Sequence, residues 1–157
     1  MIELTIKKTR NRYGLFTESP IKAGTIIEEI KGKVYDYRLL LKVGGNFLNN
    51  CIRFGELTYI SPQGYNLEFV NHSCKPNCRI DKKGGKLYLI AIKDIPKNSE
   101  LFFDYSTVTA DDDIWTMKCN CGLKSCRKII KKYTKLPKNI LNKYLEQKII
   151  PNYILKF

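Results

Sequence analysis

The 157-residue sequence is short of several residue types on which functional sites depend. It contains one histidine, one tryptophan and two methionines, and its 15 Asp and Glu residues stand against 28 Lys and Arg residues. No apolar stretch approaches the roughly 20 residues of a membrane-spanning helix. The N-terminal segment MIELTIKKTRNRYGLF lacks the long apolar core and cleavage site of a secretory signal. We therefore expect one intracellular globular domain with no membrane partner.

Cysteine, in contrast, is well represented, with six residues. In a reducing compartment, clustered cysteines more often bind a metal than form disulfides. Cys119, Cys121 and Cys126 form a C-x-C-x₄-C cluster in a loop of Gly, Lys and Ser that cannot form a core. A tetrahedral zinc ion takes four ligands, so three local thiolates predict a fourth from elsewhere. The candidates for this ligand are Cys51, Cys74, Cys78 and His72. A zinc ribbon is excluded, because it needs two such clusters.

Alternation of apolar and polar residues, interrupted by Gly and Pro, continues to about residue 105 and predicts a mostly-β domain. Strands are expected within residues 2–9, 12–32, 56–62, 78–103 and 100–105. Gly84 and Gly85 supply the turn of a hairpin within 78–103. Only residues 35–45, before a Gly44–Gly45 stop, and 136–149 look helical. In the second helix, Ile140, Leu141, Tyr144, Leu145 and Ile149 fall near one face.

The C-terminal residues 127–157 are strongly basic. They carry nine Lys and Arg residues against Glu146 alone, a net charge of +8. One interpretation is an electrostatic surface for nucleic acid or another polyanion. The other is a solvated helical face in a chain rich in lysine throughout, and composition alone does not decide between them.

The segment FVNHSCKPNC, residues 69–78, holds the only histidine. It could contain a nucleophile with its base, a corner of a metal site, or a polar turn. A hydrolase with Ser73 and His72 as nucleophile and base is disfavoured, because sequence neighbours rarely meet in the required geometry and no other histidine exists.

Four segments occur in an order typical of one family: RYGLFTESPIKAGTII, FVNHSCKPNC, ELFFDY and CNCGLKSC. Together they resemble the SET-domain lysine methyltransferases with a zinc-binding post-SET extension, and residues 106–127 resemble the small stand-alone members. The resemblance implies a mostly-β, β-clip-like SET fold with a pseudoknot, few short helices and a C-terminal helix. It divides the chain into a SET domain (1–108), a post-SET zinc segment (109–128) and a basic helical tail (129–157).

The resemblance also implies two bound groups, S-adenosylmethionine and a structural zinc ion. Residues implied to contact the cofactor are Arg12, Tyr13, Gly14, Asn71, His72 and Tyr105. The implied zinc ligands are Cys74, Cys119, Cys121 and Cys126, which would give FVNHSCKPNC a double role. Tyr105 matches the catalytic tyrosine, which orients a neutral lysine amine. Phe103 lies where the family alternates between Phe and Tyr, and phenylalanine predicts di- or trimethylation.

Three positions depart from the family pattern. Arg12 replaces the first glycine of a G-x-G cofactor turn, Ile30 replaces a tyrosine that lines the lysine channel, and Glu68 replaces an arginine. These changes bear on substrate choice more than on the fold. Trp115 could pack over the adenine or the lysine channel, but an apolar anchor for its segment is the favoured interpretation. Residues 111–113 are interpreted as a solvated acidic loop that could also attract a basic substrate.

The predicted function is S-adenosylmethionine-dependent methylation of lysine in a histone-like basic protein. The expected location is the nucleus or chromatin, or the cytoplasm of a prokaryote. The alternative is an inactive SET-fold module that binds nucleic acid or chromatin through its basic tail. The sequence does not indicate the oligomeric state.

Overall fold

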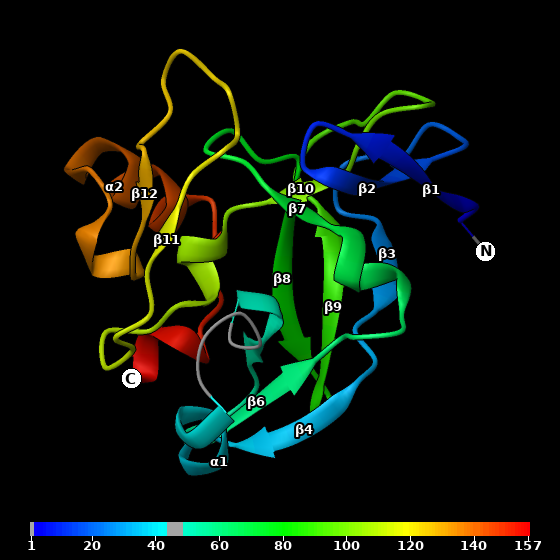
Figure 1. The fold of residues 1–157 in the computed structure, drawn as a ribbon. Helices are drawn as coiled ribbons and strands as arrows, with labels where there is room; N and C mark the ends of the chain where they lie inside the picture. The colour runs from blue at the N-terminus through cyan, green and yellow to red at the C-terminus, as the bar shows by residue number, and fades with distance from the viewer. Residues whose placement is uncertain (1, 44–48) are drawn as a thin grey trace.

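The computed structural model describes residues 2–43 and 49–157, which form small sheets with few helices, as predicted (Figure 1). The strands are β1 (Leu4–Thr9), β2 (Arg12–Thr17), β3 (Ile26–Glu29), β4 (Lys33–Asp36), β5 (Ile52–Arg53), β6 (Thr58–Ser61), β7 (Asn71–His72), β8 (Cys78–Lys83), β9 (Lys86–Ala91), β10 (Phe102–Phe103), β11 (Met117–Lys118) and β12 (Ile129–Ile130). The α-helices are α1 (Tyr37–Val43) and α2 (Lys138–Glu146). Short 3₁₀ turns are η2 (Asn66–Phe69), η3 (Tyr105–Val108), η4 (Tyr133–Lys135) and η5 (Ile154–Lys156). The predicted Gly44–Gly45 stop of the first helix lies outside the described residues. Among the described residues, no helix is long and apolar enough to cross a membrane.

The expected hairpin of β8 and β9 lies at the centre of the molecule (Figure 1). Its turn uses Gly84 and Gly85, both with positive φ (55° and 78°), a backbone region in which glycine has no steric penalty. β3 pairs with β9 to give a sheet of order β3-β9-β8, while β4, β6 and β5 form a second sheet and β1 and β2 a separate hairpin. Sequence alternation therefore identified the main strands, but not the short β4, β5, β7, β11 and β12.

Two segments far apart in the sequence pair in parallel at the centre of the fold. Asn71 and His72 of β7 lie opposite Phe102 and Phe103 of β10. The Asn77 side chain extends this contact, since its amide donates to the Glu100 carbonyl (2.8 Å) and its oxygen accepts from the Phe102 N–H (2.8 Å). This crossing lies where the family resemblance implies the pseudoknot, and it brings FVNHSCKPNC next to ELFFDY.

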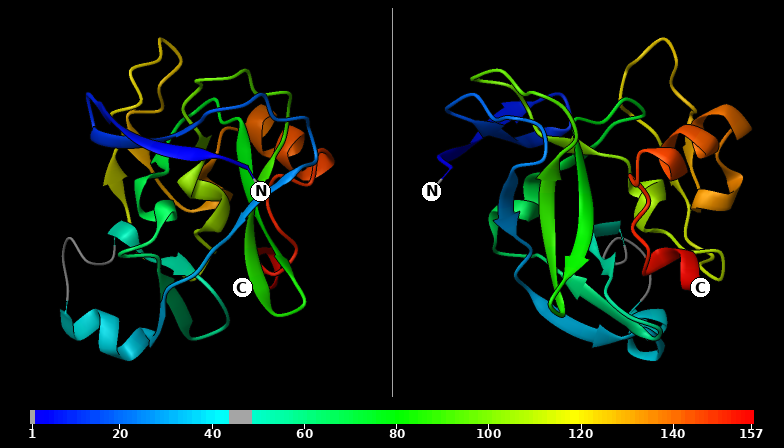
Figure 2. Two further views of the ribbon diagram at one scale, coloured as in Figure 1. Left: turned by 90° about the vertical axis from the view of Figure 1, so that its right-hand side faces the viewer. Right: turned by 180° about the vertical axis from the view of Figure 1, so that it is seen from behind.

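The C-terminal segment packs into the main core rather than extending from it. Tyr144, Ile149, Ile150 and Ile154 are buried in the same cluster as Leu15 and the β8–β9 residues. Figure 2 shows this segment, in orange and red, running beside the central hairpin. The predicted apolar face of α2 is wrong at one position. Leu145, in the last turn of the helix, is 41% exposed and lies on the solvent side. The three-part division of the chain stays a prediction.

Candidate functional site

Four cysteines from two distant parts of the chain come together. The Sγ atoms of Cys74, Cys119, Cys121 and Cys126 all lie within 4.8 Å of one another, and Cys74 Sγ is 3.8 Å from Cys119 Sγ. A tetrahedron with Zn–S bonds of about 2.3 Å has edges of about 3.8 Å, so this spacing suits a single zinc ion. The cluster could therefore hold zinc, with Cys74 supplying the ligand from outside the C-x-C-x₄-C loop.

Backbone N–H groups surround these sulfurs. Cys121 N–H points to Cys119 Sγ (3.5 Å), Arg127 N–H to Cys74 Sγ (3.5 Å) and Lys128 N–H to Cys126 Sγ (3.3 Å). Burial raises the pKa of Cys74. At Cys121, backbone and thiol hydrogen bonds outweigh the effect of burial and lower the pKa to about 7. N–H donors stabilise thiolates, which are the form that binds a metal.

A second group of predicted residues meets at the start of β2. The Asn71 side chain donates to the Tyr13 carbonyl (2.8 Å) and to Glu100 Oε1 (2.8 Å). At Gly14, an added Cβ would lie 2.3 Å from the same Glu100 oxygen, so no side chain fits without displacing Glu100. Burial raises the pKa of the Glu100 carboxyl. The oxygens of Tyr13 and Glu100 thus form an acceptor set beside Asn71, suited to an ammonium group.

A hollow of about 440 Å³ lies between the β1–β2 turn and the cysteine loop. Its wall includes Arg10 and Asn11 from the turn and Asn120 and Lys128 from the loop. The Arg10 guanidinium donates to the Asn120 carbonyl and covers Gly122, where an added Cβ would collide with it. The turn and the cysteine loop are therefore held together across this hollow.

Arg12, in the same turn, has a left-handed backbone with φ of 81° and an exposed side chain. Non-glycine residues adopt this region rarely, because the Cβ atom crowds the backbone. The positive φ explains why the G-x-G turn of the family pattern has glycine at this position. The arginine keeps the turn and adds a charge to the surface.

His72 links the cysteine cluster to the tyrosine predicted to be catalytic. Its Nδ1 accepts a hydrogen bond from the Tyr105 N–H (3.1 Å), so the remaining proton of a neutral ring is on Nε2. Nε2 lies 3.5 Å from Cys74 Sγ, a geometry in which it donates to the sulfur. Burial lowers the pKa of His72 to about 4, which keeps the ring neutral at physiological pH.

The Tyr105 hydroxyl donates to the Val70 carbonyl (2.8 Å), and its ring lies 4.7 Å from the Phe103 ring. Burial, followed by the nearby Glu100 charge, raises the pKa of Tyr105 well above its ordinary value. The hydroxyl therefore stays protonated at neutral pH. It can orient a polar group through its remaining lone pairs, and it is not suited to act as a base.

Both rings line a cavity of about 440 Å³. Its wall includes Glu68 and Trp115, whose indole N–H donates to Asn49 Oδ1 (2.8 Å). Trp115 is thus part of the cavity wall, although the sequence favoured an apolar anchor over a contact with the adenine or the lysine channel. Ile30 instead lies in the hydrophobic core, 3% exposed, and is not among the lining residues.

The acidic run Asp111–Asp113 is engaged within the molecule. Arg53, 2% exposed, pairs with Asp112 (2.5 Å) and with Asp113 (3.4 Å), and the Tyr59 hydroxyl donates to Asp113. Asp111 pairs with Lys132 (3.1 Å). The run is therefore neither a merely solvated loop nor a free acidic patch: it fixes the segment before β11 to the body of the domain.

Several residues at these sites have roles that could not be recognised in the sequence alone. Glu100 and Asp104 lie inside ELFFDY, so the motif itself marked them, but their roles depend on contacts that only the fold creates. Arg53 and Asn49 have no motif at all. Their partners lie in the segment that precedes β11, and no local pattern connects the two.

Comparison with known proteins identifies relatives of this arrangement. The family model described as SET domain matches residues 12–106. A histone-lysine N-methyltransferase, H3 lysine-4 specific, from Eremothecium gossypii is 32% identical over 132 residues, covering 74% of this chain and 13% of that protein. The methyltransferase domain of human histone-lysine N-methyltransferase SETMAR superposes with a TM-score of 0.67 at 26% identity, covering 84% of this chain and 59% of that one.

A second solved structure shares the fold at lower identity. KRYPTONITE, in complex with mCHH DNA, an H3(1-15) peptide and SAH, superposes with a TM-score of 0.65 at 21% identity, covering 83% of this chain and 30% of that one. The present chain thus spans only a small part of its curated relatives.

Proposed function

The chain belongs to the SET-domain family, and from this premise we propose that it is a protein-lysine N-methyltransferase that uses S-adenosylmethionine. Relatives named as histone-lysine N-methyltransferases and a structural neighbour bound to SAH support this assignment. The observation that carries it is the meeting of Asn71, His72, Phe103 and Tyr105 at the β7–β10 crossing. In this proposal the hollow beside the cysteine loop would serve the cofactor, and the cavity lined by Phe103 and Tyr105 would serve the substrate.

Cys74, Cys119, Cys121 and Cys126 would hold the zinc ion in this proposal, supported by the spacing of their sulfurs. The ion would have a structural role, because four thiolates leave no open position for a substrate. It would tie the post-SET segment, 109–128, to the SET domain, 1–108.

The cofactor would bind between the β1–β2 turn and the cysteine loop. S-adenosylmethionine supplies an electrophilic methyl group on a sulfonium, which becomes a neutral thioether on transfer. The acceptor oxygens of Tyr13 and Glu100, with the Asn71 side chain, would receive its ammonium group. Gly14 would let the backbone approach closely, Arg12 would lie near the carboxylate, and the His72 backbone would meet the base.

The substrate lysine would enter the cavity that contains Tyr105. Free lysine has a pKa of about 10.4, so it must lose a proton to water before its nitrogen can form the new C–N bond. The apolar walls, including Phe103 and Trp115, disfavour the ammonium form. The protonated Tyr105 hydroxyl, anchored on Val70, would then orient the amine lone pair.

Phe103 supports multiple methylation. It is buried, lines this cavity and offers no hydroxyl to hold the amine or a water molecule. An amine that already carries one methyl group can therefore rotate and be methylated again. Di- or trimethyllysine is the proposed product.

The proposed substrate is a histone or histone-like basic tail. The protein would act on it at chromatin or at a comparable nucleoprotein. Relatives specific for histone H3 and the H3 peptide bound to KRYPTONITE support this class. Glu68 places a carboxylate on the cavity wall, which favours basic residues around the target lysine.

The test is radiolabelled methyl transfer onto a panel of histones and small basic chromosomal proteins, with Tyr105→Phe as the control. Calorimetry with S-adenosylhomocysteine should show binding. Cofactor binding with no transfer to any member of the panel would favour the inactive-module alternative, and absence of both would reject the assignment.

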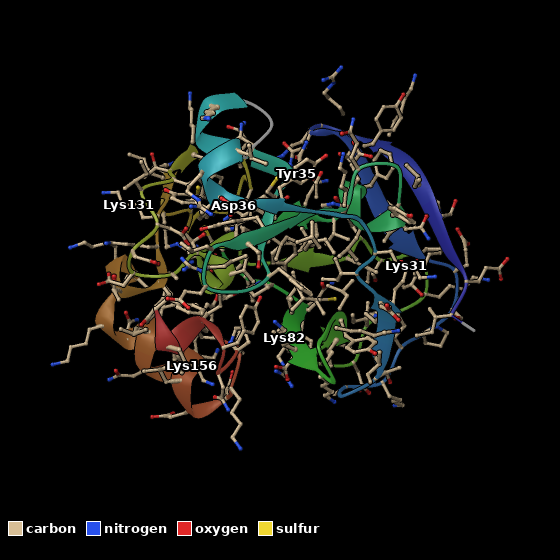
Figure 3. The ribbon with its side chains drawn as sticks, turned by 90° about the horizontal axis from the view of Figure 1, so that it is seen from below. Lys31, Tyr35, Asp36, Lys82, Lys131 and Lys156 are labelled. Carbon is tan, nitrogen blue, oxygen red and sulfur yellow. The ribbon has the colours of Figure 1, made fainter. Side chains whose placement is uncertain are left out.

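A second candidate function is nucleic-acid binding by the C-terminal segment. A hollow of about 300 Å³ is lined by Arg127, Lys128, Lys131 and Lys135. Within residues 2–43 and 49–157, the three lysines form no ion pair. In Figure 3, Lys131 and Lys156 point outward on the side of the C-terminal segment, and Lys31 lies on the opposite side.

Such a cluster fits the phosphate backbone, and binding should weaken steeply with salt. Charge reversal at Lys131 and Lys135 should abolish a DNA mobility shift while leaving binding of S-adenosylhomocysteine unchanged. A shift that persists in this variant would place the nucleic-acid surface elsewhere or reject it.

A further inference from the structure

The C-terminal helix α2 reaches the residue between β10 and η3, Asp104, through a buried hydrogen bond. Tyr144 is only 5% exposed, and its hydroxyl donates to Asp104 Oδ2 (3.1 Å). Asp104 is fully buried and immediately precedes Tyr105. The segment outside the family resemblance thus contacts the position next to the proposed catalytic residue.

The other carboxylate oxygen of Asp104 is also fully used. Oδ1 accepts from Arg127 Nη2 (2.6 Å) and from the Ser106 N–H (3.1 Å), and it lies 3.5 Å from His72 Nδ1. The contact with Ser106 caps η3, the 3₁₀ turn that begins at Tyr105. Asp104 therefore sets where this turn starts, and with it the direction of the Tyr105 side chain.

Each partner of Asp104 comes from a different segment. Arg127 directly follows the cysteine ligand candidate Cys126, Ser106 lies in η3, and Tyr144 lies in α2. Among the described residues Tyr144 supplies the hydrogen bond to Oδ2, so the loss of its hydroxyl leaves this buried carboxylate oxygen without a donor. Removing the Tyr144 hydroxyl should therefore let Asp104 turn towards Arg127, away from its capping position.

We propose that Tyr144 is a positioning residue for methyl transfer, acting through Asp104 on the orientation of Tyr105. This inference rests on the proposed function, because it assigns the C-terminal helix a part in that same site. A catalytic tyrosine moved by a fraction of an ångström loses alignment with the reacting amine, whereas binding surfaces formed by other residues are unaffected.

The test compares Tyr144→Phe with Tyr153→Phe. Both substitutions remove one tyrosine hydroxyl from the same C-terminal segment, but Tyr153 donates to the Arg53 carbonyl (2.9 Å) and is not a partner of Asp104. Tyr144→Phe should lower kcat roughly tenfold or more. Its KM for substrate, its affinity for S-adenosylhomocysteine and its zinc content should stay within about twofold of wild type, and Tyr153→Phe should keep the wild-type kcat.

Amide hydrogen exchange supplies a readout that does not need activity. The Ser106 and Thr107 amides, which bond to Asp104, should exchange faster in Tyr144→Phe and not in Tyr153→Phe. Equal kcat and equal exchange in the two variants would overturn the inference. Wild-type protein that transfers no methyl group would count against the proposed function alone, and exchange at these amides would still decide whether Tyr144 positions Asp104.

Discussion

Cys74 Sγ lies 3.8 Å from Cys119 Sγ, although a large part of the domain separates the two residues in sequence. The contact exists because the β7–β10 crossing presents Cys74 on the side where the segment with Cys119, Cys121 and Cys126 returns. Zinc binding and correct assembly of the site are therefore expected to depend on each other.

Removal of zinc is the first prediction. Purified reduced protein should contain one zinc ion per chain, and a strong chelator should lower the melting temperature and weaken binding of S-adenosylhomocysteine. The reason is that the cysteine loop forms one wall of the proposed cofactor hollow. Metal analysis and thermal unfolding with and without chelator measure the effect.

Alkylation identifies the ligands within this prediction. Zinc should protect Cys74, Cys119, Cys121 and Cys126 from iodoacetamide until the chelator is added. Cys51 and Cys78 act as internal controls, since burial raises their pKa to about 11 and about 12 and keeps them slow to react in either state. Rapid labelling of Cys74 in zinc-loaded protein would exclude it as a ligand.

The second prediction concerns the Tyr105 hydroxyl. Tyr105→Phe should lower kcat by roughly 10²–10³-fold, the usual effect of losing one oriented dipole at a reacting group. S-adenosylhomocysteine affinity should change little, because Asn71 and Glu100 remain. Calorimetry and initial rates measure the two quantities, and a variant with near-normal kcat would remove Tyr105 from the mechanism.

The pH dependence of transfer gives a third prediction. The rate should rise with pH as the substrate amine loses its proton. Ionisation of Tyr105 should cause no decline up to about pH 10, since burial raises its pKa above the ordinary value of about 10. Rates are measured only where circular dichroism shows the fold intact. A falling limb near pH 8 that disappears in Tyr105→Phe would contradict this assignment.

A fourth prediction follows from the position of Phe103. Phe103→Tyr should shift the product from di- or trimethyllysine to monomethyllysine, because a hydroxyl on the cavity wall would hold the amine or a water molecule. Mass spectrometry of products at matched turnover measures the shift. Phe102→Tyr, at the neighbouring residue of β10, is the matched control and should leave the product distribution unchanged. Wild-type protein that stops at one methyl group would contradict the prediction.

The sequence predicted those parts of the fold and site that depend on local pattern. Alternation and turn glycines identified the β8–β9 hairpin, and the spacing of Cys119, Cys121 and Cys126 identified a metal loop. Strands of two residues, such as β7 and β12, have no periodicity to detect, and they exist only because their partner segments meet them in the fold.

Charge was the least reliable guide. The acidic residues Asp112 and Asp113 serve the buried Arg53, and the basic tail contributes apolar side chains such as Ile154 to the core. Composition counts charges without showing which of them face each other across the fold, so it could not reveal these pairs.

Arg12 gives the last prediction, because its backbone and its side chain make separable contributions. With φ of 81°, residue 12 occupies a conformation that costs a non-glycine residue about 1–2 kcal/mol. Arg12→Gly and Arg12→Ala both remove the guanidinium, but only glycine relieves the Cβ crowding. The free energy of unfolding, measured by denaturant titration, should therefore be higher for Arg12→Gly than for Arg12→Ala by about 0.5–1 kcal/mol, after the greater chain entropy of glycine is counted.

The same pair of variants tests whether the backbone turn or the guanidinium of residue 12 contributes to cofactor binding. The side chain is exposed, and exposed charge contacts are worth about 0–1 kcal/mol. We therefore expect Arg12→Gly to bind S-adenosylhomocysteine within roughly fivefold of wild type, the factor that corresponds to such a contact. A loss of more than about tenfold, equal in both variants, would contradict this, because it would mean that the guanidinium and not the turn holds the cofactor.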